Sequence, residues 1–193
     1  MEKPLLFSVR ISLALVLLTP LIVMSPPFPH GFFPYVVGKA LYAHTLIEIA
    51  LGMWIVLALR HPSYRIPHSR LLLIFAIYLL IAFIAAIFGV SPQRSLWSNY
   101  ERMTGVVSLT HWFLYVVILV SVFRSWADWR VLLNINLGVG FVVCLLGVSQ
   151  YFDIWLLGFM QETNRLDITL GNATYVGTYM LVNVLIGLAL LGY

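Results

Sequence analysis

The sequence predicts an all-α protein, a polytopic bundle of about six transmembrane helices that forms one domain over residues 1–193 with both termini in the cytoplasm. The chain is 62% hydrophobic and 9% charged, whereas an ordinary soluble domain is about 45–50% apolar and about 25% charged. Its apolar runs approach the ~20 residues that a helix needs to cross the ~30 Å hydrocarbon layer. Its basic residues are concentrated in alternate connections between these runs, as in membrane proteins of defined orientation. This composition excludes a water-soluble globule.

The expected helices are apolar runs bounded by charged, proline or polar residues. The first run follows Lys3 and is followed by a proline-rich stretch rather than by a small-residue cleavage site, so we interpret it as a span and not as a signal peptide. Arg10 lies near the inner end of this run, where its side chain can reach the lipid headgroups. The six expected spans are residues 5–24, 40–59, 71–90, 104–122, 131–148 and 174–192.

The placement of lysine and arginine predicts the orientation of the bundle. The connections 25–39, 91–103 and 149–173 hold four of the eleven basic residues, so by the positive-inside rule they face the exterior. Residues 151–157 are mostly aromatic and aliphatic, and we expect them to lie along the membrane surface as an interfacial helix. The seven basic residues expected on the cytoplasmic side are Lys3, Arg10, Arg60, Arg65, Arg70, Arg124 and Arg130.

Charge and cysteine content limit the other function classes. The formal net charge of +4 comes from single basic residues scattered between apolar runs, which is unlike the clustered patch of a nucleic-acid-binding protein. The one cysteine, Cys144, lies inside an apolar run, so we expect no disulfide framework and no metal site. We expect no cofactor either. The last run ends at Gly192 and Tyr193 without a polar flank, which suggests a longer or split protein whose other half packs against this one.

Three polar residues inside the expected spans are candidates for function. His44 and Glu48 are four residues apart in the second span, so they share one face of a helix. An ionisable group at that depth must face the bundle interior, be paired or be protonated. His111, in the outer half of the fourth span, is a possible partner. Two interpretations stay open: a neutral Glu48 that is bonded to His44 or to a backbone carbonyl, and a cluster that lines a polar cavity.

The third outer connection carries two arginines close to the membrane surface. Arg94 and Arg102 lie among serine, asparagine and glutamine side chains, with Glu101 between them. The planar guanidinium group matches the geometry of phosphate oxygens, so the pair can hold a lipid-linked diphosphate. Alternatively, Glu101 neutralises the arginines and the charges only hold the loop together.

Two stretches of the chain resemble a known family. The first is GVSPQRSLWSNYERMTG at residues 89–105, followed by Leu109, Thr110 and His111, and the second is TLGNATYVGTY at residues 169–179. Both resemble loops of the bacterial O-antigen ligase and O-antigen polymerase-like membrane proteins, in the expected order and each at an outer helix start. Ser98 stands where the family commonly has glycine, and Ala173 with Thr174 where it commonly has proline and asparagine.

The resemblance implies that the chain is the amino-terminal half of a membrane glycosyltransferase of the bacterial inner membrane. Such an enzyme transfers a glycan from undecaprenyl diphosphate to lipid A core or to a growing polysaccharide. The resemblance assigns the reacting residues to a large outer loop of the carboxy-terminal half, so that half and the lipid-linked glycan are the expected partners. In this chain it implies a lipid-diphosphate site at Arg94, Glu101, Arg102 and Asn172.

A different class of protein remains as an alternative. A six-helix transporter or membrane assembly subunit without enzymatic activity would use His44 and Glu48 to line a polar path. That class accounts for the intramembrane charge, but it does not account for the two loop resemblances.

Overall fold

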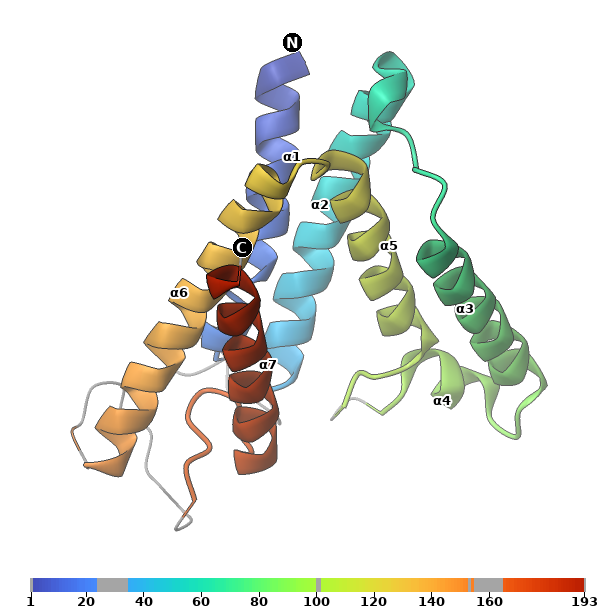
Figure 1. Cartoon of the computed structure of the whole chain (residues 1–193). Coiled ribbons are helices and arrows are strands. Elements are labelled where there is room, and N and C mark those ends of the chain that lie inside the picture. The colour runs from blue at the N-terminus through green and yellow to red at the C-terminus, as the bar shows by residue number, and fades with distance from the viewer. Residues whose placement is uncertain (1, 24–34, 100–101, 153, 155–164, 193) are drawn as a thin grey trace.

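The computed structural model describes residues 2–23, 35–99, 102–152, 154 and 165–192, and these residues are helical without any strand (Figure 1). The all-α class is therefore confirmed. The predicted interfacial helix at residues 151–157 lies mostly outside the described residues. The helices are α1 (Glu2–Val16), α2 (Val37–Arg60), α3 (Arg70–Phe88), α4 (Pro92–Trp97), α5 (Val106–Val122), α6 (Trp126–Tyr151) and α7 (Ala173–Leu191), with 3-10 turns η1 (Thr19–Leu21) and η2 (Pro62–Tyr64).

Four helices, α2, α3, α6 and α7, are long and apolar enough to cross a membrane, which indicates a membrane protein. The apolar helix α5 has 17 residues and α1 has 15, so they extend only about 26 Å and about 22 Å at 1.5 Å per residue. α1 ends at Val16 because Pro20 cannot donate in a continuing helix, and the chain tightens into η1. The six-span count thus remains a prediction.

The described parts of three connections lie at one end of the bundle. Figure 1 places η1, α4 and the 165–172 segment at this end, whereas the amino-terminal end of α1, η2 and the α5–α6 junction lie at the other. Which end faces the cytoplasm stays a prediction.

The core of the bundle is formed by α1, α2 and α5. Leu13, Ile47, Leu57 and Ile118 are fully buried there. α3 packs against α5 and α4 on one side of this core, and α7 packs against α6 on the other. α3 and α7 remain exposed over most of their apolar surface, which leaves both helices available for contact with lipid.

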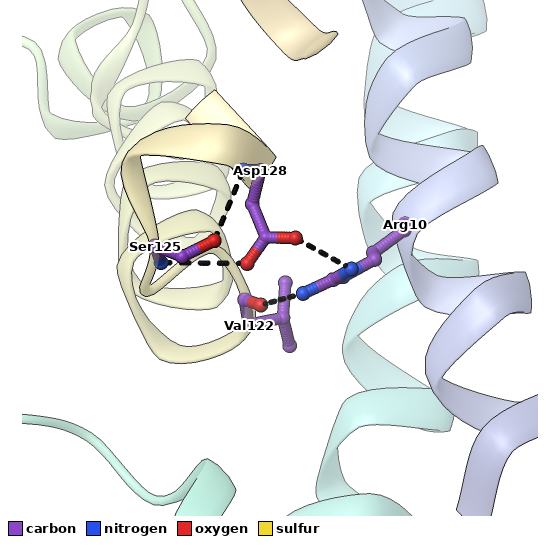
Figure 2. A network of polar contacts seen from close by, with 4 residues as sticks. All are labelled: Arg10, Val122, Ser125 and Asp128. Carbon is purple, nitrogen blue, oxygen red and sulfur yellow. Dashed lines mark hydrogen bonds and ion pairs between the residues drawn. The ribbon is translucent and has the colours of Figure 1, made fainter. Parts of the chain in front are cut away.

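Arg10 joins α1 to the α5–α6 junction (Figure 2). Its guanidinium group lies 2.9 Å from a carboxylate oxygen of Asp128 and donates to the carbonyl oxygen of Val122 at 2.8 Å. It also lies over the ring of Phe123, at 5.2 Å from the centroid. Asp128 in turn forms a capping box with Ser125, which starts α6 at Trp126, five residues before the expected span. Arg10 therefore contacts protein at this end of α1, which the sequence did not predict.

A polar contact holds α7 against α6. Asn136 donates to the side-chain oxygen of Asn183 at 3.0 Å, and the amide nitrogen of Asn183 donates to the carbonyl oxygen of Tyr179 at 2.9 Å. A Cβ atom added at Gly140 would lie 2.5 Å from that same oxygen of Asn183. The absence of a side chain at Gly140 thus makes room for the buried amide, as small residues do between membrane helices.

Candidate functional site

The polar residues of α2 and α5 form one cluster at the interface of these helices. His111 Nε2 lies 3.0 Å from Glu48 Oε1, and the ring of His44 stacks on that of His111 with centroids 4.1 Å apart. His44 Nε2 lies 3.1 Å from the hydroxyl of Ser108. Glu48 is thus paired with His111 rather than with His44. The sequence reasoning missed Ser108, although its position three residues before His111 puts both on one face of α5.

The hydrogen-bond partners of His111 indicate where the hydrogens of the Glu48–His111 pair lie. His111 Nδ1 lies 2.8 Å from the carbonyl oxygen of Val107, and because a carbonyl only accepts, we infer that Nδ1 carries a hydrogen. The bond between Nε2 and Glu48 then needs one more hydrogen. It sits on the carboxyl group if the imidazole is neutral and on Nε2 if it is cationic. In both cases Glu48 and His111 share one proton and have no net charge, which suits a membrane interior.

The two partners differ in exposure. The side chain of Glu48 is 66% exposed and that of His111 is 14% exposed, so the carboxyl group lies at the edge of the α2–α5 interface. The described residues contain no group of three or more His, Cys, Asp or Glu side chains placed to hold a metal ion. The cluster therefore combines a largely buried imidazole of His111 with an accessible carboxyl group of Glu48.

The second candidate site surrounds α4. An open hollow of about 270 Å³ is lined by Arg94 and by the polar side chains of its neighbours. Among the described residues, no ion pair involves Arg94 or Arg102. Glu101 lies outside the described residues, so the expected neutralisation of the arginines stays a prediction. The lining residues are Ser91, Gln93, Arg94, Trp97, Ser98 and Asn99.

The backbone after α4 is folded tightly. Asn99 accepts from the backbone nitrogen of Arg102 through its carbonyl oxygen at 3.2 Å and its side-chain oxygen at 3.0 Å. Ser98 ends α4 with φ of 64° and ψ of −169°, a region that is essentially restricted to glycine. A Cβ atom at Gly105 would overlap the carbonyl group of Leu96. The close approach of α4 to the start of α5 thus requires a glycine at 105 and favours one at 98.

Asn172 does not join this loop. Its side-chain oxygen accepts from the backbone nitrogen of Thr174 at 2.8 Å and caps α7. α7 and α4 lie on opposite sides of the α2 and α5 helices (Figure 1). Just before α7, the carbonyl oxygen of Thr169 accepts from the Lys39 ammonium group, which ties this segment to α2. Asn172 therefore has a structural role that accounts for its side chain.

Comparison of the chain with family models, with curated proteins and with solved structures finds no match. The features that indicate a function are the polar cluster of α2 and α5, the hollow beside α4 and the two loop stretches that resemble the ligase family.

Proposed function

We propose that the chain belongs to a glycosyltransferase of the O-antigen ligase-like class in the bacterial inner membrane. Within it, the loop around α4 holds the diphosphate group of an undecaprenyl-linked glycan. The observation that carries this proposal is the hollow beside α4, where Arg94 lies among uncharged hydrogen-bonding side chains. The glycan passes to lipid A core or to a growing polysaccharide.

The chemistry of the hollow fits a diphosphate. Arginine donates in a planar fork that two phosphate oxygens can accept together. Ser98 and Asn99 add hydroxyl and amide donors at the same place. Trp97, which is 64% exposed, is a side chain suited to the interface between headgroups and hydrocarbon, where the phosphates of a lipid carrier lie.

The geometry of the loop also supports the resemblance. Glycine is the common family residue where Ser98 has a positive φ. Proline is common where Ala173 begins α7, and the first helical position is the one that proline favours. At both positions where the chain departs from the family pattern, the backbone conformation favours the residue that is common in the family.

Binding of undecaprenyl diphosphate to the purified chain in lipid nanodiscs tests the donor site. Arg94→Lys keeps the charge but loses the bidentate geometry, so we expect about a tenfold loss of affinity, equivalent to about 1.4 kcal/mol. Arg102→Lys is expected to act in the same direction. The matched control is Arg130→Lys, an exposed arginine of α6, which should bind normally. Equal affinity in all three variants would contradict the proposal.

Transfer of glycan from the same carrier by this chain together with the carboxy-terminal half that the resemblance implies tests the enzyme class. Gel analysis of the lipid A core or polysaccharide product follows the reaction. We expect Arg94→Lys to reduce transfer together with donor binding. Unchanged transfer in a variant that no longer binds the carrier would remove this loop from the reaction.

We propose in addition that six segments cross the membrane and that both termini are cytoplasmic. The four basic residues of the outer connections, against seven in the inner ones, support this orientation. In a Cys144→Ala background, a membrane-impermeant thiol reagent applied from outside should label Ser98→Cys and spare Ser63→Cys. The reverse pattern of labelling would contradict the topology.

The proton shared by Glu48 and His111 favours a second candidate function, a transporter or assembly subunit that moves protons. Glu48→Gln retains a group that donates to His111 Nε2 but has no acidic proton to release. In proteoliposomes with an internal pH dye, this class predicts proton flux that Glu48→Gln abolishes without unfolding the protein. Absence of flux in the unaltered chain would exclude it.

A further inference from the structure

A second, larger hollow lies beside α5 at the end of the bundle opposite α4. Its volume is about 680 Å³, within the range of about 300–1,000 Å³ that is typical of ligand sites. α3 packs on α5 and α4, while α2 packs on α1 and α5, so α5 separates α3 from α2. Figure 1 shows the connection from η2 descending beside α5 to the start of α3. This connection lines the open hollow together with residues of α2, α3 and α5.

The walls of the hollow are apolar. Trp54 of α2 contributes an indole ring whose N–H already donates to the carbonyl oxygen of Tyr64 at 3.0 Å. The ring therefore presents no free donor to an occupant. A hydrocarbon chain can be buried against such apolar walls without cost, because it has no polar group that needs a hydrogen bond. The remaining apolar lining residues are Ile66, Pro67, Leu72, Leu73, Ala76, Phe113, Leu114 and Val117.

The rim of the hollow is polar and basic. His68, Ser69 and Arg70 line it where the connection joins α3. The Ser69 hydroxyl is engaged, because it accepts from the backbone nitrogen of Leu72 and caps the helix. Arg70 is the first residue of α3, where the positive end of the helix dipole opposes a cation. Its position is therefore not explained by stabilisation of the helix.

Among the described residues, the carboxylates at this end, Glu2 and Asp128, already have other partners. Glu2 lies 3.6 Å from His61 and accepts from a tyrosine hydroxyl, and Asp128 is paired with Arg10 at 2.9 Å. Among the described residues no ion pair involves Arg70. An exposed cation thus stands at the mouth of an apolar hollow.

We propose that this hollow binds an anionic phospholipid, with one acyl chain between α3 and α5 and the phosphate group at Arg70 and His68. The two halves of the ligand match the two parts of the site, since hydrocarbon fits the walls and negative charge fits the rim. The bilayer that surrounds α3 supplies the ligand. This site is separate from the α4 loop, so the proposal stands or fails independently of the glycosyltransferase assignment.

Native mass spectrometry of the purified chain with added phosphatidylglycerol or phosphatidylcholine of identical acyl chains tests the proposal. We expect phosphatidylglycerol to bind more tightly. Arg70→Gln should lower its affinity about fivefold, which corresponds to about 1 kcal/mol for one basic residue at an anionic surface. It should leave phosphatidylcholine unaffected. The matched control is Arg130→Gln, another exposed arginine expected on the same side, which should change neither affinity.

A second pair of variants tests the acyl-chain part. Ala76→Phe fills the hollow and should abolish binding of both lipids. Ile77→Phe places the same phenyl ring at an exposed position outside the hollow and should leave binding unchanged. Circular dichroism checks that each variant keeps its helices. Equal affinity for the two lipids, an equal effect of Arg70→Gln and Arg130→Gln, or full binding by a helical Ala76→Phe variant would each overturn the proposal.

Discussion

The contact between Arg10 and Asp128 should be measurable as an energetic coupling between α1 and the α5–α6 junction. Arg10→Met keeps the aliphatic stem but removes the ion pair at 2.9 Å, the bond to the Val122 carbonyl oxygen at 2.8 Å and the cation–π contact with Phe123. The pair is partly exposed, at 32% for Arg10 and 23% for Asp128. Such a contact is therefore strong enough to detect but weaker than a fully buried one.

The magnitude follows from the separate contacts. A partly exposed ion pair contributes about 1 kcal/mol, a hydrogen bond from a charged donor about 1.5–3 kcal/mol and a cation–π contact about 0.5–1 kcal/mol. Against these, Nε of Arg10 is buried without a hydrogen-bond partner, an arrangement that costs about 1–3 kcal/mol and that the substitution relieves. We therefore expect Arg10→Met to lower the free energy of unfolding by about 2 kcal/mol.

A double-mutant cycle isolates the ion pair. Asp128→Ala removes the pair and half of the capping box, so it should also cost about 2 kcal/mol. The double variant should lose about 3 kcal/mol rather than 4, which is a coupling of about 1 kcal/mol. Unfolding in mixed micelles, followed by tryptophan fluorescence, measures each value. Arg130→Met, which removes an exposed charge on the same helix, should stay within about 0.5 kcal/mol of the unaltered protein.

Two results would refute this reasoning. An unfolding free energy of Arg10→Met equal to that of Arg130→Met would mean that the guanidinium contributes nothing to packing. A coupling below about 0.3 kcal/mol lies within the range of independent sites. It would mean that the ion pair between Arg10 and Asp128 does not stabilise the fold.

Three further predictions concern glycine positions and use the same unfolding assay. Ser98→Gly should stabilise the chain by about 1 kcal/mol because it relieves a non-glycine residue at φ of 64°, and a loss of stability would contradict the strain. Gly105→Ala should destabilise the α4–α5 contact by more than about 2 kcal/mol and weaken carrier binding, since its Cβ overlaps the Leu96 carbonyl group. Gly140→Ala should lower the free energy of unfolding by about 1–3 kcal/mol, because the added Cβ displaces Asn183. The control is Gly138→Ala, whose Cβ would have no atom within 4 Å, and this change should be neutral or stabilising.

The membrane class, the helices and the shared faces within them followed from the sequence by itself. The apolar content determines that the chain resides in a membrane rather than in water. Helix geometry places residues four apart on one face in any surroundings. His44 and Glu48 were therefore expected on one face of a helix. Arg94 was expected in a polar connection, but the structure places it in the short helix α4, which the sequence did not predict. Helix ends were less accurate, because Pro20 and the Ser125 cap act locally and shift them by several residues.

Only the tertiary structure decided which residues meet across helices. The partner of Arg10 is Asp128 and that of Glu48 is His111, and each pair depends on how helices are rotated about their axes. Sequence spacing does not record that rotation, because it results from the fit of all the packed side chains at once. For the same reason Asn172, grouped with Arg94 from the resemblance, caps α7 on the other side of the bundle. The hollow beside α5 likewise depends on the packing of α5 between α2 and α3.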